Sequence, residues 1–428
     1  MKKIFFVAMI TAGLVVQAQE EVPAPAAAQK ERICIKGATI HVGNGTVIEN
    51  GYLVFNNGVI ENIFSAANVK TDATLGKVID ATGKHIYPGL IALNTVIGLG
   101  EIEAVRATND ASEIGGMTPE ARAAIAYNTD SRVTPTVRTN GVLFAQAAPQ
   151  NGRISGTSSV MQLDAWNWED AIVKADDGIF MNWPSMFRMK GWWAQPEGYE
   201  VSKDYVKQVN ELRQYFREAQ AYASGSNTKV NLRFESMRGL FSGSKQLYIR
   251  VDFVKEILNA ISFAEEMGLK PVIVGGKDSY QIADQLAQKK IPVIVSKAHD
   301  LPSYNDDDIQ QPYKTPGMLM KAGVLTAISI DGFWQPRNLA FEAGTAATYG
   351  LTKEEALQLI TANPAKIAGL SQLGTLEAGK SASFIISTGD VLDMRTSKIE
   401  RAFIAGRDID LDNKQTELYR KFSGKYGF

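Results

Sequence analysis

Few side chains in this chain can bind a metal or exchange a proton at neutral pH. The 428 residues include three histidines, His41, His85 and His299, and one cysteine, Cys34. A single cysteine cannot form an intramolecular disulfide or an all-cysteine metal site. Three histidines cannot place four imidazoles at one point. A mechanism that needs four imidazoles in one site is therefore excluded.

Two residues are candidates for acid–base catalysis. Asp331, in the segment IDG, offers a carboxylate that could orient or deprotonate water; the alternative is an ion pair with Arg337. His299, in the segment SKAHD, follows a predicted strand and titrates in a range that suits an acid or a base. The alternative for His299 is a structural role at the end of that strand.

Cationic and hydroxyl side chains supply candidates for ligand binding. Arg250 and Lys297 together could bind an anionic group, because a guanidinium and an ammonium both pair with carboxylate or phosphate. The alternative for Arg250 is a salt bridge inside the protein. The segment GRISGTSS, residues 152–159, could present backbone amides and the hydroxyls of Thr157 and Ser158 to a ligand. It lacks the lysine and the spacing of a P-loop.

The elements that must position these side chains follow two patterns. From residue 88 to 370, short apolar strands alternate with helices, which predicts a parallel sheet, and the length suits an eight-stranded α/β barrel. Short strands without helices occupy residues 32–87 and return at 371–411. We therefore expect an α/β fold, a TIM-like (β/α)8 barrel with a split β-sandwich domain from both chain ends.

Tryptophan is concentrated in one part of the predicted barrel. Five of the six tryptophans fall within 28 residues, namely Trp166, Trp168, Trp183, Trp192 and Trp193. We interpret residues 152–200 as a Trp-rich insertion between barrel strands. Trp166 and Trp168 would form an aromatic wall over the barrel mouth that binds a sugar or a short peptide. A small core within the insertion explains the same cluster equally well.

The N-terminal residues predict export. Lys2 and Lys3 precede an apolar run, residues 4–16, that is too short to cross a bilayer, and Val16-Gln17-Ala18 fits a cleavage site. We expect a signal peptide at 1–18, a linker at 19–31, a C-terminal tail at 412–428, and a periplasmic or secreted bacterial protein. The 45 basic and 46 acidic residues favour no nucleic-acid partner, and no later segment predicts membrane attachment after signal removal.

Three motifs, in order along the chain, resemble those of one enzyme superfamily. They are DATGKHIYPGLI at 80–91, TANPAK at 361–366 and GTLEAGK at 374–380. Together they resemble the amidohydrolase superfamily, most closely its imidazolonepropionase-like branch. The resemblance implies a split β-sandwich around a TIM-like barrel. It also implies metal-assisted hydrolysis, usually of C–N bonds, with zinc or another divalent metal.

The resemblance also implies where the metal ligands should lie, and most of those positions are substituted. The His-x-His pair of the first strand falls on Asn94 and Val96, and the histidine of the fifth strand falls near Arg250. The sixth-strand histidine falls in the segment VGG at 274–276, and only Asp331 matches the aspartate that follows the last strand. We therefore predict no bound metal or other cofactor, and we keep Asn94 as a ligand-binding candidate.

Two functions remain open. The first is an exported hydrolase of C–N bonds other than peptide bonds, with a degenerate metal site, in which Asp331 activates water and Arg250 stabilises the oxyanion. The second is a catalytically inactive subunit on the same fold that binds a ligand or a partner protein. The expected partners are a small molecule, a short peptide or a sugar, with a homo-oligomer or an intact paralogue as the expected assembly.

Overall fold

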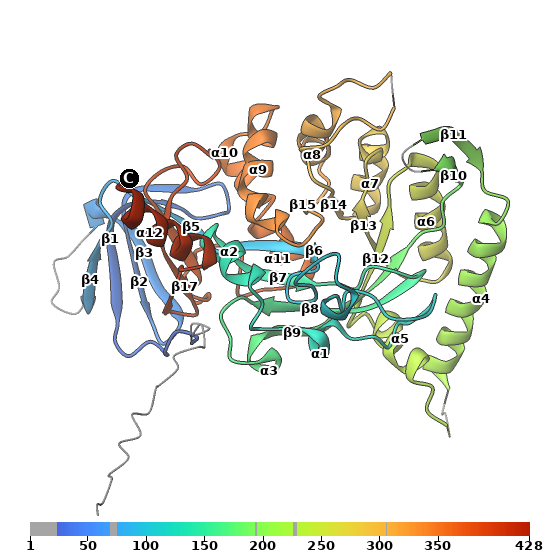
Figure 1. Cartoon of the computed structure of the whole chain (residues 1–428), viewed down its shortest axis with the longest axis horizontal. Coiled ribbons are helices and arrows are strands. Elements are labelled where there is room, and N and C mark those ends of the chain that lie inside the picture. The colour runs from blue at the N-terminus through green and yellow to red at the C-terminus, as the bar shows by residue number, and fades with distance from the viewer. Residues whose placement is uncertain (1–23, 69–74, 193–194, 226–228, 305) are drawn as a thin grey trace, which may run out of the picture.

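The computed structural model describes residues 24–68, 75–192, 195–225, 229–304 and 306–428. The predicted signal peptide and the first residues of the predicted linker lie outside this range. Figure 1 shows a sheet domain beside a larger domain in which helices surround a second sheet. Of the described residues, no helix combines the length and the apolar character needed to cross a membrane.

The sheet domain is built from both ends of the chain. β5 pairs antiparallel with β16, with Ile86 opposite Ile386, and this contact joins the N-terminal strands to the C-terminal ones. Phe55, Phe384 and Phe403 pack against one another in its core. Its strands are β1 (Ile33–His41), β2 (Val47–Asn56), β3 (Val59–Ser65), β4 (Lys77–Asp80), β5 (His85–Pro88), β16 (Phe384–Ser387), β17 (Ile399–Ile404) and β18 (Arg407–Ile409).

The second sheet is a nearly closed barrel, which confirms the predicted fold class. In the described part of the chain its order is β15-β14-β13-β12-β9-β8-β7-β6. Residues 359–360 bridge the two outer strands, because Ile328 N–H donates to Leu359 and Ile91 N–H donates to Ile360, over 3.1 and 2.9 Å. The strands are β6 (Leu90–Thr95), β7 (Val142–Ala147), β8 (Ile154–Gln162), β9 (Ile172–Asn182), β12 (Gln246–Val251), β13 (Pro271–Gly275), β14 (Val293–Val295) and β15 (Thr326–Ile328).

Residues 152–200 are not the insertion that the sequence analysis expected. β8 and β9 are strands of the barrel itself, and β8 runs antiparallel to both of its neighbours. Gly156 has a φ of +141°, and a Cβ there would lie 2.5 Å from the carbonyl oxygen of Ala121. The glycines and hydroxyls that suggested a loop therefore allow close packing around a buried strand. Only the hairpin β10 (Phe187–Trp192) and β11 (Gln195–Val201) projects from this region.

Helices cover the outside of the barrel between its strands. α4 buries Val209, Leu212, Phe216 and Ala219 on one face, whereas Val206 is exposed. Thr352 and Glu355 form a capping box at the start of α10. The longer helices are α2 (Val133–Thr139), α4 (Tyr205–Ser224), α5 (Leu232–Ser242), α6 (Val254–Glu266), α7 (Ala283–Lys289), α8 (Gln311–Lys321), α9 (Leu339–Thr348), α10 (Lys353–Gln358), α11 (Ala362–Ala368) and α12 (Lys414–Tyr426).

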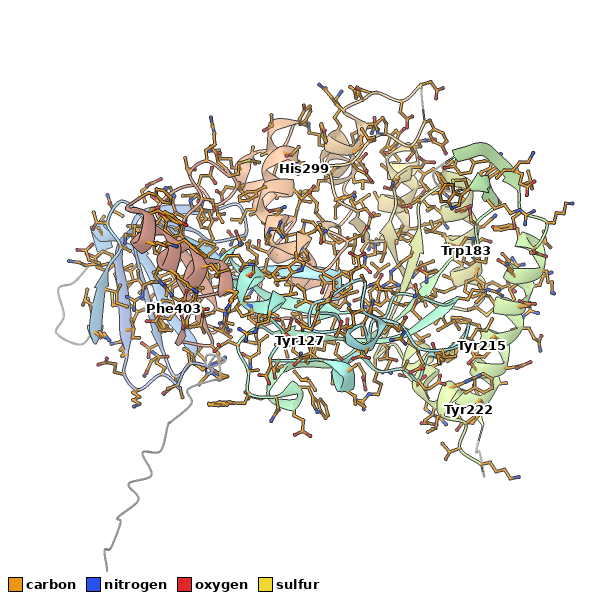
Figure 2. All side chains as sticks on the ribbon, in the orientation of Figure 1. Tyr127, Trp183, Tyr215, Tyr222, His299 and Phe403 are labelled. Carbon is orange, nitrogen blue, oxygen red and sulfur yellow. The ribbon has the colours of Figure 1, made fainter. Side chains whose placement is uncertain are left out.

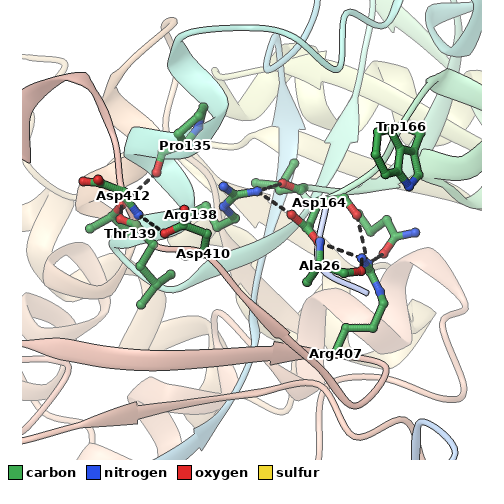
Figure 3. A network of polar contacts seen from close by, with 12 residues as sticks. Ala26, Pro135, Arg138, Thr139, Asp164, Trp166, Arg407, Asp410 and Asp412 are labelled. Atoms are coloured by element: carbon green, nitrogen blue, oxygen red, sulfur yellow. Dashed lines mark hydrogen bonds and ion pairs between the residues drawn. The ribbon is translucent and has the colours of Figure 1, made fainter. Parts of the chain in front are cut away.

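The described part of the predicted linker is docked on the protein. Asp164, which follows β8, accepts from the backbone N–H of Ala26 over 3.0 Å (Figure 3). The same carboxylate accepts from Arg138 over 2.8 Å and from Arg407 over 2.6 Å. Arg407 also donates to the carbonyl oxygen of Ala26 over 3.2 Å. One buried carboxylate therefore joins the N-terminal segment, the barrel and the sheet domain.

Candidate functional site

The carboxyl ends of β6, β12 and β15 bring three of the predicted site residues to the barrel mouth. Asn94 lies in β6, Arg250 lies in β12, and Asp331 follows β15. The Nε and Nη2 groups of Arg250 both donate to Oδ1 of Asn94, over 3.0 and 2.8 Å. Asn94 adopts a φ of +52°, a conformation that asparagine accepts more readily than most residues.

The remaining donors of Arg250 are directed at the loop that follows β7. Nη2 donates to the carbonyl oxygen of Pro149 over 2.9 Å, and Nη1 donates to the carbonyl oxygen of Gln150 and to Oγ of Ser155, both over 3.3 Å. The guanidinium also lies over the ring of Phe180, 4.5 Å from its centroid. All five N–H donors of Arg250 are therefore engaged by the protein.

Arg250 does not form the internal salt bridge that was considered as its alternative role. Within the described residues, no carboxylate lies within ion-pair distance of its guanidinium, because the loop carbonyls and Asn94 take that place. Burial lowers the pKa of Arg250 to about 9, and the negative charge of Asp331 partly opposes this shift. Asp331 itself is exposed at the mouth. Arg250 is consequently not free to bind an anion together with Lys297.

A buried polar network continues from Asn94 into the barrel. The backbone N–H of Asn94 donates to Gln146 over 3.1 Å, and Gln146 donates to Asp177 over 2.7 Å. Asp177 also accepts from Ser158 over 2.7 Å and from Tyr248 over 3.1 Å. Asp177 is 1% exposed, and burial raises its pKa while the three hydrogen bonds oppose that rise. Ser158 therefore supports the barrel interior and is not presented to a ligand.

Neither this network nor the carboxylate of Asp252 at the mouth was predicted from the sequence. An acidic residue within the apolar strand 172–182 is a signal that could have identified Asp177, since both faces of such a strand are usually buried. Asp252 directly follows β12, and its Oδ1 is buried without a hydrogen-bond partner in the described structure. Burial raises the pKa of Asp252, with Asp331 adding to the rise and Lys277 opposing it.

A pocket lies beside the mouth, between the ends of β13 and β14 and the loop before α8. It has a volume of about 30 Å³, and its walls include Lys277, Lys297, Tyr280 and Leu301 together with three aspartates, Asp278, Asp300 and Asp307. Lys277 pairs with Asp300 over 3.3 Å. Within the described residues, Lys297 has no ion-pair partner. The pocket therefore presents one ammonium without an ion-pair partner, beside carboxylates and apolar surface.

His299 connects the loop after β14 to α9 through hydrogen bonds. Its backbone N–H donates to Glu342 over 2.8 Å, its Nδ1 lies 3.2 Å from the same carboxylate, and its Nε2 lies 2.6 Å from Oγ1 of Thr345. Both ring nitrogens are thus engaged by a helix on the outside of the barrel, where Figure 2 labels His299. The structure supports the structural alternative for His299 and does not bring it into contact with Asp331.

The predicted aromatic wall is not at the mouth. Because β8 is antiparallel, its end meets the beginning of β7, where Leu163 N–H donates to Leu143 over 3.0 Å. Trp166 and Trp168 therefore lie at the opposite end of the barrel, and Trp166 is 67% exposed there. Trp183 is buried and donates to Tyr205 over 3.2 Å (Figure 2).

The other predicted residues in this region are also away from the mouth. Thr157 donates to the carbonyl oxygen of Pro119 over 2.7 Å and is buried. Trp192 is exposed on the projecting hairpin, and Trp193 lies outside the described residues. Neither Thr157 nor Trp192 therefore joins Asn94, Arg250 and Asp331.

The donor atoms at the mouth do not fit a divalent transition metal. Zinc prefers four nitrogen, sulfur or carboxylate ligands around one point. In the described part of the chain, no group of three or more histidine, cysteine, aspartate or glutamate side chains is placed to hold a metal ion. The central group is instead the cationic guanidinium of Arg250, which donates two hydrogen bonds to the carboxamide oxygen of Asn94.

Comparison with known proteins places these features in one family. A model of the amidohydrolase family matches residues 132–409. The crystal structure of an amidohydrolase from Thermotoga maritima MSB8 is 26% identical, covers 88% of this chain and 99% of its own, and superposes with a TM-score of 0.74. The structure of A. niger ochratoxinase is 16% identical over 88% of this chain and 95% of its own, with a TM-score of 0.54, which shows the fold alone.

One curated relative matches over a short segment. The amidohydrolase tasK of Hapsidospora irregularis is 33% identical over 119 residues, which is 24% of this chain and 12% of that protein. The chain therefore spans only a small part of the length of this relative.

Proposed function

Because the chain belongs to the amidohydrolase family of hydrolases, we propose that it is a member that binds a small ligand at the barrel mouth without the family's metal-assisted reaction. One observation carries this proposal. The guanidinium of Arg250 lies beside Asn94, at positions where the resemblance in the sequence implies metal ligands, and all five of its donors are engaged by the protein.

The contacts of Arg250 oppose both metal binding and oxyanion stabilisation at this place in the barrel mouth. Metal-assisted hydrolysis depends on a Lewis acid that lowers the pKa of bound water and polarises the substrate. A cation cannot coordinate another cation, and the carboxamide oxygen of Asn94 is already used. An oxyanion would need donors aimed at the substrate. The donors of Arg250 are aimed at Asn94 and the loop at 149–155 instead.

The pocket beside the mouth offers a contact for an anionic group of a small ligand at Lys297, although Asp278, Asp300 and Asp307 also line it. Lys297 supplies a cation without an ion-pair partner in the described structure, and Tyr280 and Leu301 supply apolar surface. Small-molecule sites usually combine apolar walls with a few placed polar groups. The short peptide or sugar of the sequence analysis is less well supported, because Trp166 and Trp168 lie at the other end of the barrel.

A second candidate is metal-independent hydrolysis of a C–N bond by two carboxyl groups. Asp252 has a buried oxygen without a partner, and its pKa is raised by burial, so it is suited to donate a proton. Asp331 is exposed, and its charge acts on Asp252, so it is suited to accept a proton from water. Two carboxyl groups in different environments are a common arrangement for acid–base catalysis.

A panel of amide, carbamate and cyclic ureide substrates separates these functions. The first proposal predicts no hydrolysis above that of an Asp252→Asn/Asp331→Asn variant. It also predicts saturable thermal stabilisation by a small carboxylate that is weakened in Lys297→Ala. Lys289→Ala serves as the matched control, since Lys289 pairs with Glu265 on the outer surface. Hydrolysis that resists a chelator and is lost in Asp331→Asn would favour the second candidate. Hydrolysis that a chelator abolishes and zinc restores would overturn both.

We further propose that the protein is exported to the periplasm or secreted, on the basis of the signal-like residues 1–18. Association with a second copy or with an intact paralogue remains part of the proposal. N-terminal sequencing of protein from the producing bacterium tests the cleavage after Ala18. Light scattering of the purified chain tests self-association.

A further inference from the structure

Two of the three histidines of the chain lie together where the sheet domain meets the barrel. His41 ends β1, and His85 begins β5, which pairs with β1 in parallel. Nε2 of His41 lies 3.1 Å from Nδ1 of His85, and Nδ1 of His41 lies 2.7 Å from a carboxylate oxygen of Glu354 on α10. The third histidine, His299, belongs to a different part of the molecule.

The carboxylate of Glu354 sets the protonation of the pair. A carboxylate accepts hydrogen bonds, so Nδ1 of His41 carries the proton and Nε2 holds a lone pair. His85 then donates its Nδ1 proton to that lone pair. Tyr87 stacks on the ring of His41 with centroids 4.3 Å apart and holds the imidazole in place. The second oxygen of Glu354 is buried without a hydrogen-bond partner among the described residues.

The spacing of the two nitrogens is close to that of two ligands of one metal ion. Nitrogens that bind one ion at about 2.0–2.1 Å lie about 2.9 Å apart in a square-planar site and about 3.3 Å apart in a tetrahedral one. The separation between His41 and His85 is 3.1 Å. A metal-bound histidine usually donates its other ring N–H to a carboxylate, as His41 does to Glu354. His85 needs only to move its proton from Nδ1 to Nε2, so binding requires no net loss of a proton from this ring.

The pair is accessible from a neighbouring pocket. A pocket of about 420 Å³ opens beside the rings, lined by His41, His85, Tyr87, Lys353, Asp390 and Thr396. Lys353 pairs with Asp390 over 2.7 Å. Glu354 and Asp393 also line the pocket, so the rim has a net negative charge, which suits a cation.

We propose that His41 and His85 form a two-imidazole site for a borderline divalent cation, with Cu²⁺ bound more tightly than Ni²⁺ or Zn²⁺. Copper binds nitrogen ligands most strongly among these ions. The described residues offer no group of three or more acidic, histidine or cysteine ligands at one point, so water completes the coordination. The site is separate from the barrel mouth. Through Glu354, a bound ion would also stabilise the contact between β1, β5 and α10.

Titration of the purified full chain with Cu²⁺ tests this proposal. Electron paramagnetic resonance should report two nitrogen ligands at one equivalent of copper. We expect His85→Ala to weaken the affinity at least tenfold and to lose the second nitrogen. Glu354→Leu, which removes the carboxylate that orients His41, should weaken it by about tenfold. His299→Ala is the matched control and should bind copper as the wild type does.

Stability measurements decide the outcome if His85→Ala folds poorly. Copper should then stabilise the wild type and His299→Ala against urea but not the milder variant His85→Gln. Equal copper binding by the wild type and His85→Gln, or loss of binding in His299→Ala, would overturn the proposal. Binding that remains unchanged in every variant would identify an adventitious ion only.

Discussion

Arg250 donates through both Nε and Nη2 to the single carboxamide oxygen of Asn94, over 3.0 and 2.8 Å. The two residues lie 156 positions apart in the sequence, on β6 and β12. The resemblance to the amidohydrolase superfamily places a metal-binding histidine at each of these positions. Two substitutions that look independent in the sequence therefore form one contact in the structure.

This contact should be visible as an energetic coupling. Arg250→Met leaves the oxygen of Asn94 and two loop carbonyls without donors, and we expect the free energy of unfolding to fall by about 3 kcal/mol. Asn94→Gly removes the oxygen and keeps the positive φ. The double-mutant cycle should give a coupling of about 1–3 kcal/mol in urea unfolding experiments. Strictly additive effects of the two substitutions would contradict the contact.

Restoring one histidine should not restore a metal site at the mouth. In Arg250→His, the neighbouring positions still hold Asn94, Val96 and Gly275, which offer too few ligands for zinc. We expect elemental analysis to find no additional zinc after dialysis against the metal. The comparison is made in the His85→Ala background, so that the proposed copper site does not contribute. One further zinc per chain in Arg250→His would contradict this expectation.

Asp177 should make stability depend on pH. Its pKa in the folded protein is raised by burial, so the folded state holds a proton that the unfolded chain releases at lower pH. The stability that this proton provides is complete below the pKa of the unfolded chain and is lost as the pH rises through the folded pKa. Asp177→Asn should flatten the fall in urea midpoint above pH 4. An unchanged pH profile in Asp177→Asn would show that another group is responsible.

Asp164 should be among the most sensitive acidic positions for stability. Asp164→Asn leaves Arg138 and Arg407 buried without their shared carboxylate (Figure 3), and we expect a loss of about 3–5 kcal/mol. Asp176→Asn is the matched control, because its ion pair with Arg122 is partly exposed and should contribute no more than about 1 kcal/mol. Equal losses in the two variants, measured by urea unfolding, would refute a special role for Asp164.

The sequence predicts the barrel and the two-ended sheet domain because both depend on local patterns. Alternating apolar strands and helices and the motif at 80–91 are sufficient to place β6 and the strands after β12. The direction of β8 is not a local property. The apolar pattern of a strand is the same whichever way the strand runs in the sheet. Residues 152–200 were therefore predicted to be an insertion, and Trp166 was placed at the wrong end of the barrel.

The candidate site was predictable in its positions but not in its contacts. The resemblance placed Asn94, Arg250 and Asp331 near one another, and the structure brings all three to the mouth. The resemblance could not indicate that the carbonyl oxygens of residues 149 and 150 accept hydrogen bonds from Arg250, because those contacts depend on the course of the loop. Asp252 was missed because a lone acidic residue carries no spacing signal, and Asp177 was missed although its place in a strand-like segment was a usable signal.

The contact between Ala26 and Arg407 has a consequence for how the chain folds during synthesis. The two residues are 381 positions apart, so the ribosome needs roughly 20–75 s between them at about 5–20 residues per second. For most of that time β16 has not been synthesised, so the edge of β5 that pairs with β16 in the folded protein is uncovered. The barrel strands are complete before the sheet domain can close. A nascent chain of this protein must therefore either be held by a chaperone or remain soluble as an open half-sheet.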